Sequence, residues 1–339
     1  MTDEEHQILQ WHLRTAQNAD HKAMGQRYRV CPEPIPGVDG LEFATKVEAR
    51  LWLASNRRNL VHLVETASAR GRHFETWALA EALWAYFTSN GNYDDAERCY
   101  RLAAQAAVKD RNEVARLRMM LLLAQTLNDA RSFDTAADVL AEIRELADAH
   151  LDDPDPQVAD QMLALAGTGL EFTGRLALKR ERHDEAFTWF AKALDNAREQ
   201  DRRAPNPRVV ALQLWFLAKC HRALGRPDEA AEHFDRAADL LRAAGDSRTG
   251  VEVHIEASLF ALERGEPDAT EQVLAALDNA QDEELPQPAA AGWLDLARLS
   301  PPPRRTEYLQ RALELYESIR DPAVDEVRAL VEESKRKGS

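Results

Sequence analysis

The sequence has few of the residues and patterns that mark secreted, membrane or disulfide-rich proteins. It contains three cysteines in 339 residues, Cys31, Cys99 and Cys220, which are far apart and odd in number. Such a set supports neither a disulfide framework nor a zinc knuckle. No apolar run approaches the ~20 residues that cross a bilayer, and the acidic start MTDEEHQILQ lacks the apolar core of a signal peptide. We therefore expect a cytoplasmic protein without a membrane partner.

The sequence also lacks a basic excess and the motifs of common catalytic sites. The formal charge is −15, from 43 basic and 58 acidic residues, whereas a surface that binds duplex DNA must be basic. There is no P-loop (G-x-x-x-x-G-K-[S/T]), no H-E-x-x-H zinc motif and no G-x-S-x-G nucleophile elbow. We expect a protein that is not an enzyme, carries no cofactor or metal, and does not bind nucleic acid directly.

Glycine is scarce as well, with 14 residues, and no stretch alternates apolar and polar residues as a β-strand does. Apolar residues instead recur at spacings of three and four, as in Trp77, Ala80, Leu83, Trp84 and Phe87. This spacing places them on one face of a helix. The sequence therefore predicts an all-α protein.

A ten-residue phrase recurs five times along the chain. It reads GNYDDAERCY at 91–100, RSFDTAADVL at 131–140, ERHDEAFTWF at 181–190, GRPDEAAEHF at 225–234 and GEPDATEQVL at 265–274. The starts are 40, 50, 44 and 40 residues apart, and each phrase follows one helical stretch and opens another. A period of this length indicates stacked helical hairpins. With a degenerate pair at 289–320, we expect about six hairpins in a superhelix.

Each position of the phrase has a predicted structural role. The first residue, a glycine in three copies, ends a helix in the left-handed conformation. The sixth residue is small in most copies and the tenth is bulky, so that two helices approach closely and the space beside them is filled. The fourth residue is always aspartate and is expected to cap the next helix, at Asp94, Asp134, Asp184, Asp228 and Asp268. Packed helices place these carboxylates ~10 Å apart, too far to share a metal.

This pattern resembles the tetratricopeptide repeat. The family motif combines a small or aromatic residue, the glycine, the alanine, an aromatic residue and a second small residue, here Trp84, Gly91, Ala96, Tyr100 and Ala103 in the first copy. The period exceeds the family's usual ~34 residues, and Arg131 and Glu181 replace the glycine in two copies. We predict a helical cap at 1–70 with a proline-rich linker at 31–40, followed by tetratricopeptide-like repeats at 71–339.

The first ninety residues carry a second resemblance. HLRTAQNAD (12–20), PEPIPG (32–37), FATKVEARLWLASNRRNLVHLV (43–64) and WALAEALWAYFTSNGNYDDA (77–96) are similar to the stretch that opens the repeat arm of actinobacterial antibiotic regulatory proteins of the STAND and SARP type. The matching residues are Phe43, Trp52, Leu53, Arg57, Asn59 and Leu60, while Ala54 and Asn56 replace two acidic positions. The resemblance implies a sensor or regulatory arm in transcriptional control. Its partner would be a protein or peptide, with an NTPase or DNA-binding regulator as one candidate.

In tetratricopeptide folds the first helix of each hairpin lines a concave groove, and the resemblance assigns groove positions in this chain by register. The assigned ligand-binding residues are Arg118, Gln125, Asn128, Arg175, Lys179, Trp215, Lys219 and Arg222. The five cations among them form a basic stripe, which suits an acidic or carboxylate-bearing segment. The alternative is that these cations pair with neighbouring acids as structural bridges.

The run GTGLEFTG at 167–174 leaves a second function open. Its glycines either allow close helix packing or widen the groove into a pocket for a pathway metabolite. Such a pocket would be bordered by Gly167, Gly169, Trp215 and Phe216. The sequence thus supports a peptide-binding scaffold, with a small-molecule sensor as the alternative, and leaves the ligand and the oligomeric state open.

Overall fold

The computed structural model of the chain is built from α-helices. It describes residues 2–25, 27–31, 33–151, 153–282, 285–319, 321 and 323–338, and no strand occurs within these ranges. The predicted all-α class is confirmed. No helix in the described part is long and apolar enough to cross a membrane. Residue 32 of the predicted proline-rich linker lies outside the described ranges.

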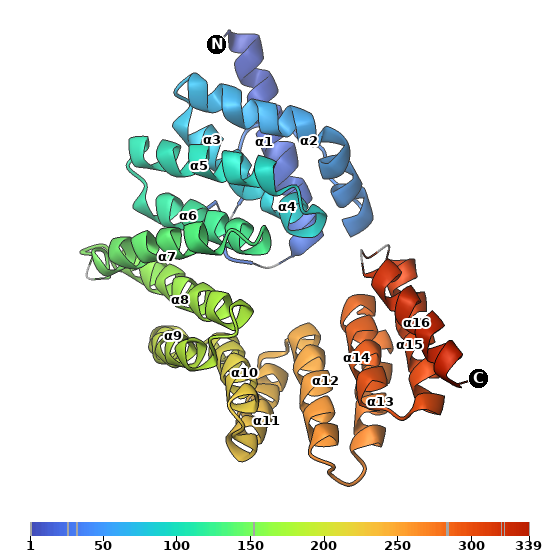
Figure 1. Cartoon of the computed structure of the whole chain (residues 1–339). Helices are drawn as coiled ribbons and strands as arrows, with labels where there is room; N and C mark the ends of the chain where they lie inside the picture. The colour runs from blue at the N-terminus through green and yellow to red at the C-terminus, as the bar shows by residue number, and fades with distance from the viewer. Residues whose placement is uncertain are drawn as a thin grey trace. The chain divides into compact units, whose positions relative to one another are not determined.

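The chain divides into two compact units, Met1–Arg182 and His183–Ser339. The division falls inside the predicted repeat region, and the boundary predicted at residue 70 stays a prediction. In unit 1, α3 and α4 are two parts of one helix that breaks at Leu83. The helices of unit 1 are α1 (Asp3–Met24), α2 (Lys46–Ala69), α3 (His73–Ala82), α4 (Trp84–Asn90), α5 (Tyr93–Lys109), α6 (Glu113–Asp129), α7 (Phe133–Asp148) and α8 (Pro156–Lys179) (Figure 1).

Unit 2 continues the same succession of helices (Figure 1). They are α9 (His183–Arg203), α10 (Pro207–Ala223), α11 (Pro227–Ala244), α12 (Ser247–Glu263), α13 (Ala269–Asp282), α14 (Pro286–Leu299), α15 (Pro302–Ser318) and α16 (Val324–Gly338). The degenerate hairpin predicted at 289–320 corresponds to α14 and α15. Each unit has a core of its own, in which buried side chains of neighbouring hairpins meet.

The repeated phrase turns the chain at the same place in every copy. Its first residue has a positive φ throughout, +62° at Gly91, +60° at Arg131, +59° at Glu181 and +69° at both Gly225 and Gly265. The predicted left-handed helix ending is therefore confirmed, and it holds even where arginine or glutamate replaces glycine. Packing of the hairpins holds this left-handed conformation, and Arg131 and Glu181 bear its steric cost.

The position predicted for the aspartates is wrong in four of the five copies. Asp94, Asp134, Asp184 and Asp228 are the second residues of α5, α7, α9 and α11. The residue that precedes α5, α7 and α11 makes no side-chain cap hydrogen bond. Asp268 directly precedes α13, and its carbonyl accepts the amide of Gln272 at 3.0 Å. The turn is so tight that the residue directly after the left-handed position already supplies the first helical carbonyl, as Asn92 does for the amide of Ala96. The four aspartates thus act as first-turn charges that favour the positive end of the helix dipole.

The small and bulky positions pack as predicted in the first four copies of the phrase. Ala136 and Ala230 have no exposed surface, and Leu140 and Phe234 are 1% exposed. In the fifth copy the buried pair is Ala269 and Val273, one residue before the predicted pair. An alanine at this place lets the two helices of a hairpin approach, and the aromatic ring one turn later fills the space beside it.

Replacing Glu181 by glycine is expected to stabilise the protein by about 0.5–1 kcal/mol. A left-handed residue with a side chain costs roughly 1–2 kcal/mol, of which the greater freedom of glycine in the unfolded chain cancels about half. Urea denaturation measures the change. Gly225→Glu is the reverse control, because a Cβ at Gly225 meets nothing within 4 Å, and it should lower stability. A Glu181→Gly protein that is less stable than the wild type would show that the left-handed conformation of Glu181 is not strained.

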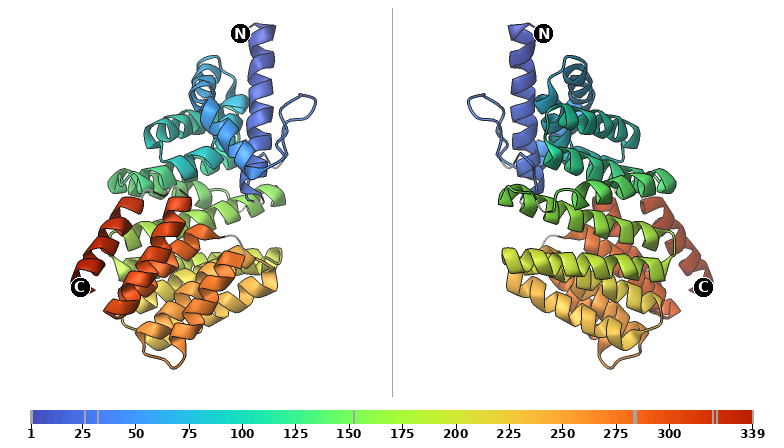
Figure 2. Two further views of the ribbon diagram at one scale, coloured as in Figure 1. Left: turned by 90° about the vertical axis from the view of Figure 1, so that its right-hand side faces the viewer. Right: turned by 90° about the vertical axis from the view of Figure 1, so that its left-hand side faces the viewer.

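The segment between α1 and α2 runs back along α1 (Figure 2). We call residues 27–31 and 33–42 the strap. Polar side chains of α1 hold its backbone: the amide of Ile35 donates to Gln17 at 2.9 Å, and the amide of Leu41 donates to Thr15 at 3.1 Å. Asn18 donates to the carbonyl of Leu41 at 2.9 Å. The stretch HLRTAQNAD thus contributes buried polar residues to α1 because the strap needs partners for its backbone.

Candidate ligand-binding surface

The eight residues predicted to line a groove fall into two sets, each within one unit. Arg118, Gln125, Asn128, Arg175 and Lys179 belong to unit 1, and Trp215, Lys219 and Arg222 to unit 2. All lie on the first helices of hairpins, namely α6, α8 and α10.

Arg118 lies beneath the strap. Its side chain is 10% exposed, and its Nε is 3.5 Å from Oε1 of Glu81. It donates to the carbonyl of Tyr28 at 3.4 Å, and its guanidinium carbon lies 5.7 Å from the centre of the Tyr28 ring. Burial lowers the pKa of Arg118, and the Glu81 carboxylate opposes that shift. In this structure the partners of Arg118 come from the chain itself.

Three predicted residues gather at the carboxyl end of α6. The indole of Trp84 donates to Gln125 at 3.4 Å. The ammonium of Lys179, on α8, donates to Asp129 at 2.9 Å and to the backbone carbonyl of Asn128 at 3.4 Å. The Lys179 ammonium thus lies at the carboxyl end of α6, where the helix dipole favours a cation.

Arg175 of α8 pairs within its own helix. Its Nη1 is 3.6 Å from Oε1 of Glu171, one turn earlier, and its guanidinium carbon lies 5.5 Å from the centre of the Phe172 ring. Both members of the pair are partly exposed, so the interaction adds little to stability.

Trp215, Lys219 and Glu256 form one cluster in unit 2. The indole of Trp215 donates to Oε2 of Glu256 at 2.9 Å, and Lys219 donates to Oε1 at 2.8 Å. The Lys219 ammonium also lies 4.4 Å from the centre of the indole. The cation therefore sits between a carboxylate and an aromatic face, each of which stabilises its charge.

The third predicted residue of unit 2 repeats this arrangement one turn further along α10. Arg222 bonds Glu263 of α12, and its guanidinium carbon lies 5.9 Å from the centre of the Phe260 ring. All five predicted cations therefore have a carboxylate partner within the described residues. This is the structural pairing that the sequence left open.

Sequence reasoning missed Glu256 and Glu263, the carboxylate partners in unit 2, although a signal for them exists. Trp84–Gln125, Trp215–Glu256 and Arg222–Glu263 are each separated by 41 residues. This separation is close to the 40-residue steps of the phrase. Side chains at equivalent places on successive first helices therefore face each other. Comparing Arg222 with the residues about one period later would have found Glu263.

A pocket of about 200 Å³ lies beside this cluster, between α10, α12 and α14. Its lining combines carboxylates, an indole and apolar groups: Trp215, Glu252, Ile255, Glu256, Leu259, Gln287, Pro288, Ala291, Gly292 and Asp295. Burial raises the pKa of Glu252, and Arg248 opposes the rise. The first helices of three successive hairpins thus line one recess. Glu256 lies in its wall and accepts a hydrogen bond from Lys219.

Gly169, in the glycine-rich run of α8, allows close packing of two helices. A Cβ at Gly169 would lie 2.9 Å from Cγ2 of Ile143 on α7, closer than real Cβ contacts come. The packing interpretation therefore accounts for Gly169. Within the described part of the chain, no group of three or more His, Cys, Asp or Glu side chains is placed to hold a metal ion.

Gly292→Ala is expected to destabilise unit 2 by about 1–3 kcal/mol, the usual cost of overpacking a core. A Cβ at this place on α14 would lie 2.6 Å from Cδ2 of Leu277 and 2.8 Å from Cγ2 of Ile255. Gly250→Ala on α12 is the control, because its Cβ would meet Leu241 at an ordinary 3.8 Å. That change should be neutral or stabilising by up to about 1 kcal/mol. Thermal unfolding of both variants measures the contrast, and equal effects would contradict the packing.

The repeated hairpins and their shared turn define a helical-repeat protein. The profile of the tetratricopeptide repeat family matches residues 214–248, around the fourth copy of the phrase. The hairpin of α10 and α11 thus matches the tetratricopeptide repeat. A search among curated proteins finds no match.

Several solved structures share the fold at low sequence identity. The apo form of RapI is 12% identical, with a TM-score of 0.57 over 84% of this chain and 97% of that one. The Rap conjugation gene regulator of plasmid pLS20, in complex with the Phr* peptide, is 12% identical, with a TM-score of 0.53 over 94% and 96%. A Rap protein complexed with the competence and sporulation factor is 13% identical, with a TM-score of 0.51 over 78% and 76%.

Proposed function

We propose that this chain is a non-catalytic scaffold that binds a segment of a protein or peptide partner on the first helices of its hairpins. The observation that carries the proposal is the recess between α10, α12 and α14, where Trp215 and Lys219 lie side by side. Two similar folds were solved with a bound Phr* peptide or with the competence and sporulation factor. By its resemblance to regulator arms, the chain acts as a cytoplasmic sensor or regulatory arm in transcriptional control.

The ligand we propose is acidic or ends in a carboxylate, and it contacts Lys219 and Arg222. Both cations are paired in this structure, yet the Lys219 and Glu256 side chains are 33% and 29% exposed. A half-exposed ion pair is worth about 0–1 kcal/mol, so a ligand carboxylate can replace Glu256 at little cost. The Trp215 ring then supplies an apolar surface next to the ligand carboxylate on Lys219.

The test titrates the full chain with acidic, neutral and basic peptides of equal length. We expect the acidic peptide to bind most tightly, and Lys219→Glu together with Arg222→Glu to weaken it by at least about tenfold, or about 1.4 kcal/mol. Arg208→Glu is the matched control, because Arg208 lies at the start of α10 and bonds Asp246 away from the pocket. Arg175→Glu tests the unit 1 prediction separately. Acidic-peptide binding that survives the double charge reversal would reject this ligand assignment.

A pathway metabolite is the alternative ligand. A recess of about 200 Å³ is below the roughly 300–1,000 Å³ of most small-molecule sites, which favours a peptide lying across the surface. Thermal-shift screening separates the two functions. If a metabolite raises the midpoint of thermal unfolding and no peptide does, the small-molecule sensor is favoured.

A further inference from the structure

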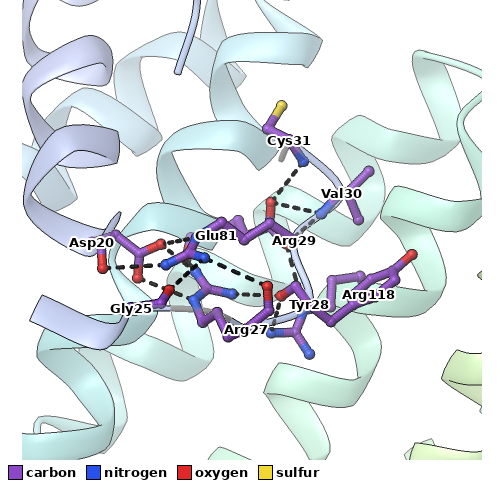
Figure 3. A network of polar contacts seen from close by, with 9 residues as sticks. All are labelled: Asp20, Gly25, Arg27, Tyr28, Arg29, Val30, Cys31, Glu81 and Arg118. Atoms are coloured by element: carbon purple, nitrogen blue, oxygen red, sulfur yellow. Dashed lines mark hydrogen bonds and ion pairs between the residues drawn. The ribbon is translucent and has the colours of Figure 1, made fainter. Parts of the chain in front are cut away.

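Strap residues 27–31 contact α3 and α6, and Glu81 of α3 holds their backbone, which bends at Val30 and Cys31 (Figure 3). Its carboxylate accepts the amide of Val30 at 2.9 Å and the amide of Cys31 at 3.2 Å. One buried carboxylate therefore binds two consecutive backbone amides. Such contacts recognise a bent main chain whose successive amides converge, whatever its side chains are.

Two arginines of the strap are bound by one aspartate of α1. Asp20 accepts from Arg27 through both of its oxygens, at 3.1 and 2.7 Å, and from Nε of Arg29 at 2.6 Å. The Asp20 side chain is 2% exposed, and those of Arg27 and Arg29 are 9% and 6% exposed. Figure 3 shows both guanidiniums directed at this carboxylate. The guanidinium carbon of Arg27 also lies 4.8 Å from the centre of the Trp84 ring.

The aromatic residue between the two arginines has a partner of its own. Arg118 of α6 contacts both the ring and the carbonyl of Tyr28. The surface therefore recognises an arginine, an aromatic residue, a second arginine and the two backbone amides that follow. Every feature of this short sequence thus has a buried partner: Asp20 for the two arginines, Arg118 for Tyr28 and Glu81 for the two amides.

Glu81 and Arg118 lie on the first helices of two successive hairpins, where the repeat register places ligand-binding residues. In unit 1 these places are filled by the chain's own strap. We propose that this surface is a peptide-binding site, that residues 27–31 occupy it in cis, and that a partner with an Arg-aromatic-Arg segment displaces them. The site is separate from the proposed recess in unit 2, so either proposal can fail without the other.

Buried charge explains why the displacing segment must match the strap. An unoccupied surface leaves the Asp20 carboxylate without its arginines in a poorly solvated place, which costs several kcal/mol, and leaves Glu81 with Arg118 alone. Exchange with a segment of the same chemistry restores every pair. An acidic or purely apolar segment does not restore the two pairs with Asp20.

The first test vacates the surface without altering it. The full chain with Arg27→Ala, Tyr28→Ala and Arg29→Ala keeps Asp20, Glu81 and Arg118. A labelled peptide of residues 25–33, with serine in place of its cysteine, should bind this variant at least roughly tenfold more tightly than a peptide with the same three alanines. Wild-type protein and an Arg101→Ala control, which loses only an exposed pair with Glu97, should bind it at least about tenfold more weakly. Equal binding of both peptides to the triple variant would overturn the proposal.

A second test uses the wild-type chain and does not depend on the folding of a variant. Cys31 is the half-buried cysteine of the strap, whereas Cys99 and Cys220 are fully buried. Burial raises the pKa of Cys31 to about 12, so a thiol reagent should label it slowly while the strap is bound. The free peptide at a concentration on the order of mM, comparable to the effective concentration of a short tethered segment, should displace about half of the bound strap and speed labelling by at least about twofold. No acceleration, or the same acceleration by the alanine peptide, would contradict displacement.

Discussion

Phe190→Ala is expected to lower the free energy of unfolding of unit 2 by about 3–5 kcal/mol, the usual cost of removing a fully buried ring. Phe190 of α9 has no exposed surface. Its ring stacks on Phe216 of α10 with centroids 4.7 Å apart and 6° between the ring planes. Phe216 in turn stacks on Trp215 at 5.6 Å. The cavity left by alanine therefore lies directly behind the proposed ligand-binding surface.

Urea denaturation followed by tryptophan fluorescence measures this loss. Phe187→Ala on the same helix is the matched control, because Phe187 is only half-buried and its removal leaves a smaller cavity. It should cost less than half as much. If the two variants lost equal stability, the tenth position of the phrase would not carry the packing assigned to it.

Glu81→Ala is expected to destabilise unit 1 by about 3–5 kcal/mol, the usual cost of breaking a buried ion pair. The change leaves the Arg118 guanidinium without its carboxylate and the amides of Val30 and Cys31 without an acceptor. Glu81→Gln should have a smaller effect, because its side-chain oxygen can still accept a hydrogen bond. Chemical denaturation gives the stability, and hydrogen exchange at Val30 and Cys31 shows whether the strap has come loose.

The control for this prediction is an ion pair at the surface of the same unit. Glu113 and Arg116 of α6 lie 3.1 Å apart, with side chains 30% and 35% exposed. Glu113→Ala should cost less than about 1 kcal/mol, since water replaces the lost partner. If the Glu81→Ala protein is as stable as the Glu113→Ala protein, the buried Glu81–Arg118 pair contributes no more to stability than the exposed pair.

The sequence alone determined the helical class, the hairpin period and the residues that close the hairpins. These features are local: an apolar spacing of three and four makes a helix, and a recurring small residue followed one turn later by a bulky one makes a hairpin. The structure confirmed the turn even at Arg131 and Glu181. It moved four of the five aspartates from the cap into the first helical turn, a shift of two residues that a repeat pattern does not resolve.

The partners of the candidate site residues depended on contacts between elements distant in sequence. The register placed Lys219 and Arg222 on a first helix, but their carboxylate partners lie on the next first helix, about one period away. Nothing local in the sequence pairs a cation with an acid at that separation. In unit 2 the predicted basic residues therefore form two matched pairs, and Glu256 of the first pair lines the recess.

The strap gives the clearest division between the two sources of information. The sequence shows that residues 31–40 are rich in proline and that Arg27 and Arg29 are basic, which by itself describes a solvated linker. Only the tertiary structure brings Asp20, Glu81 and Arg118 around residues 27–31 from three different helices. Helix formation is decided by neighbours a few residues apart, whereas burial of charge is decided by which distant helices supply a counter-charge.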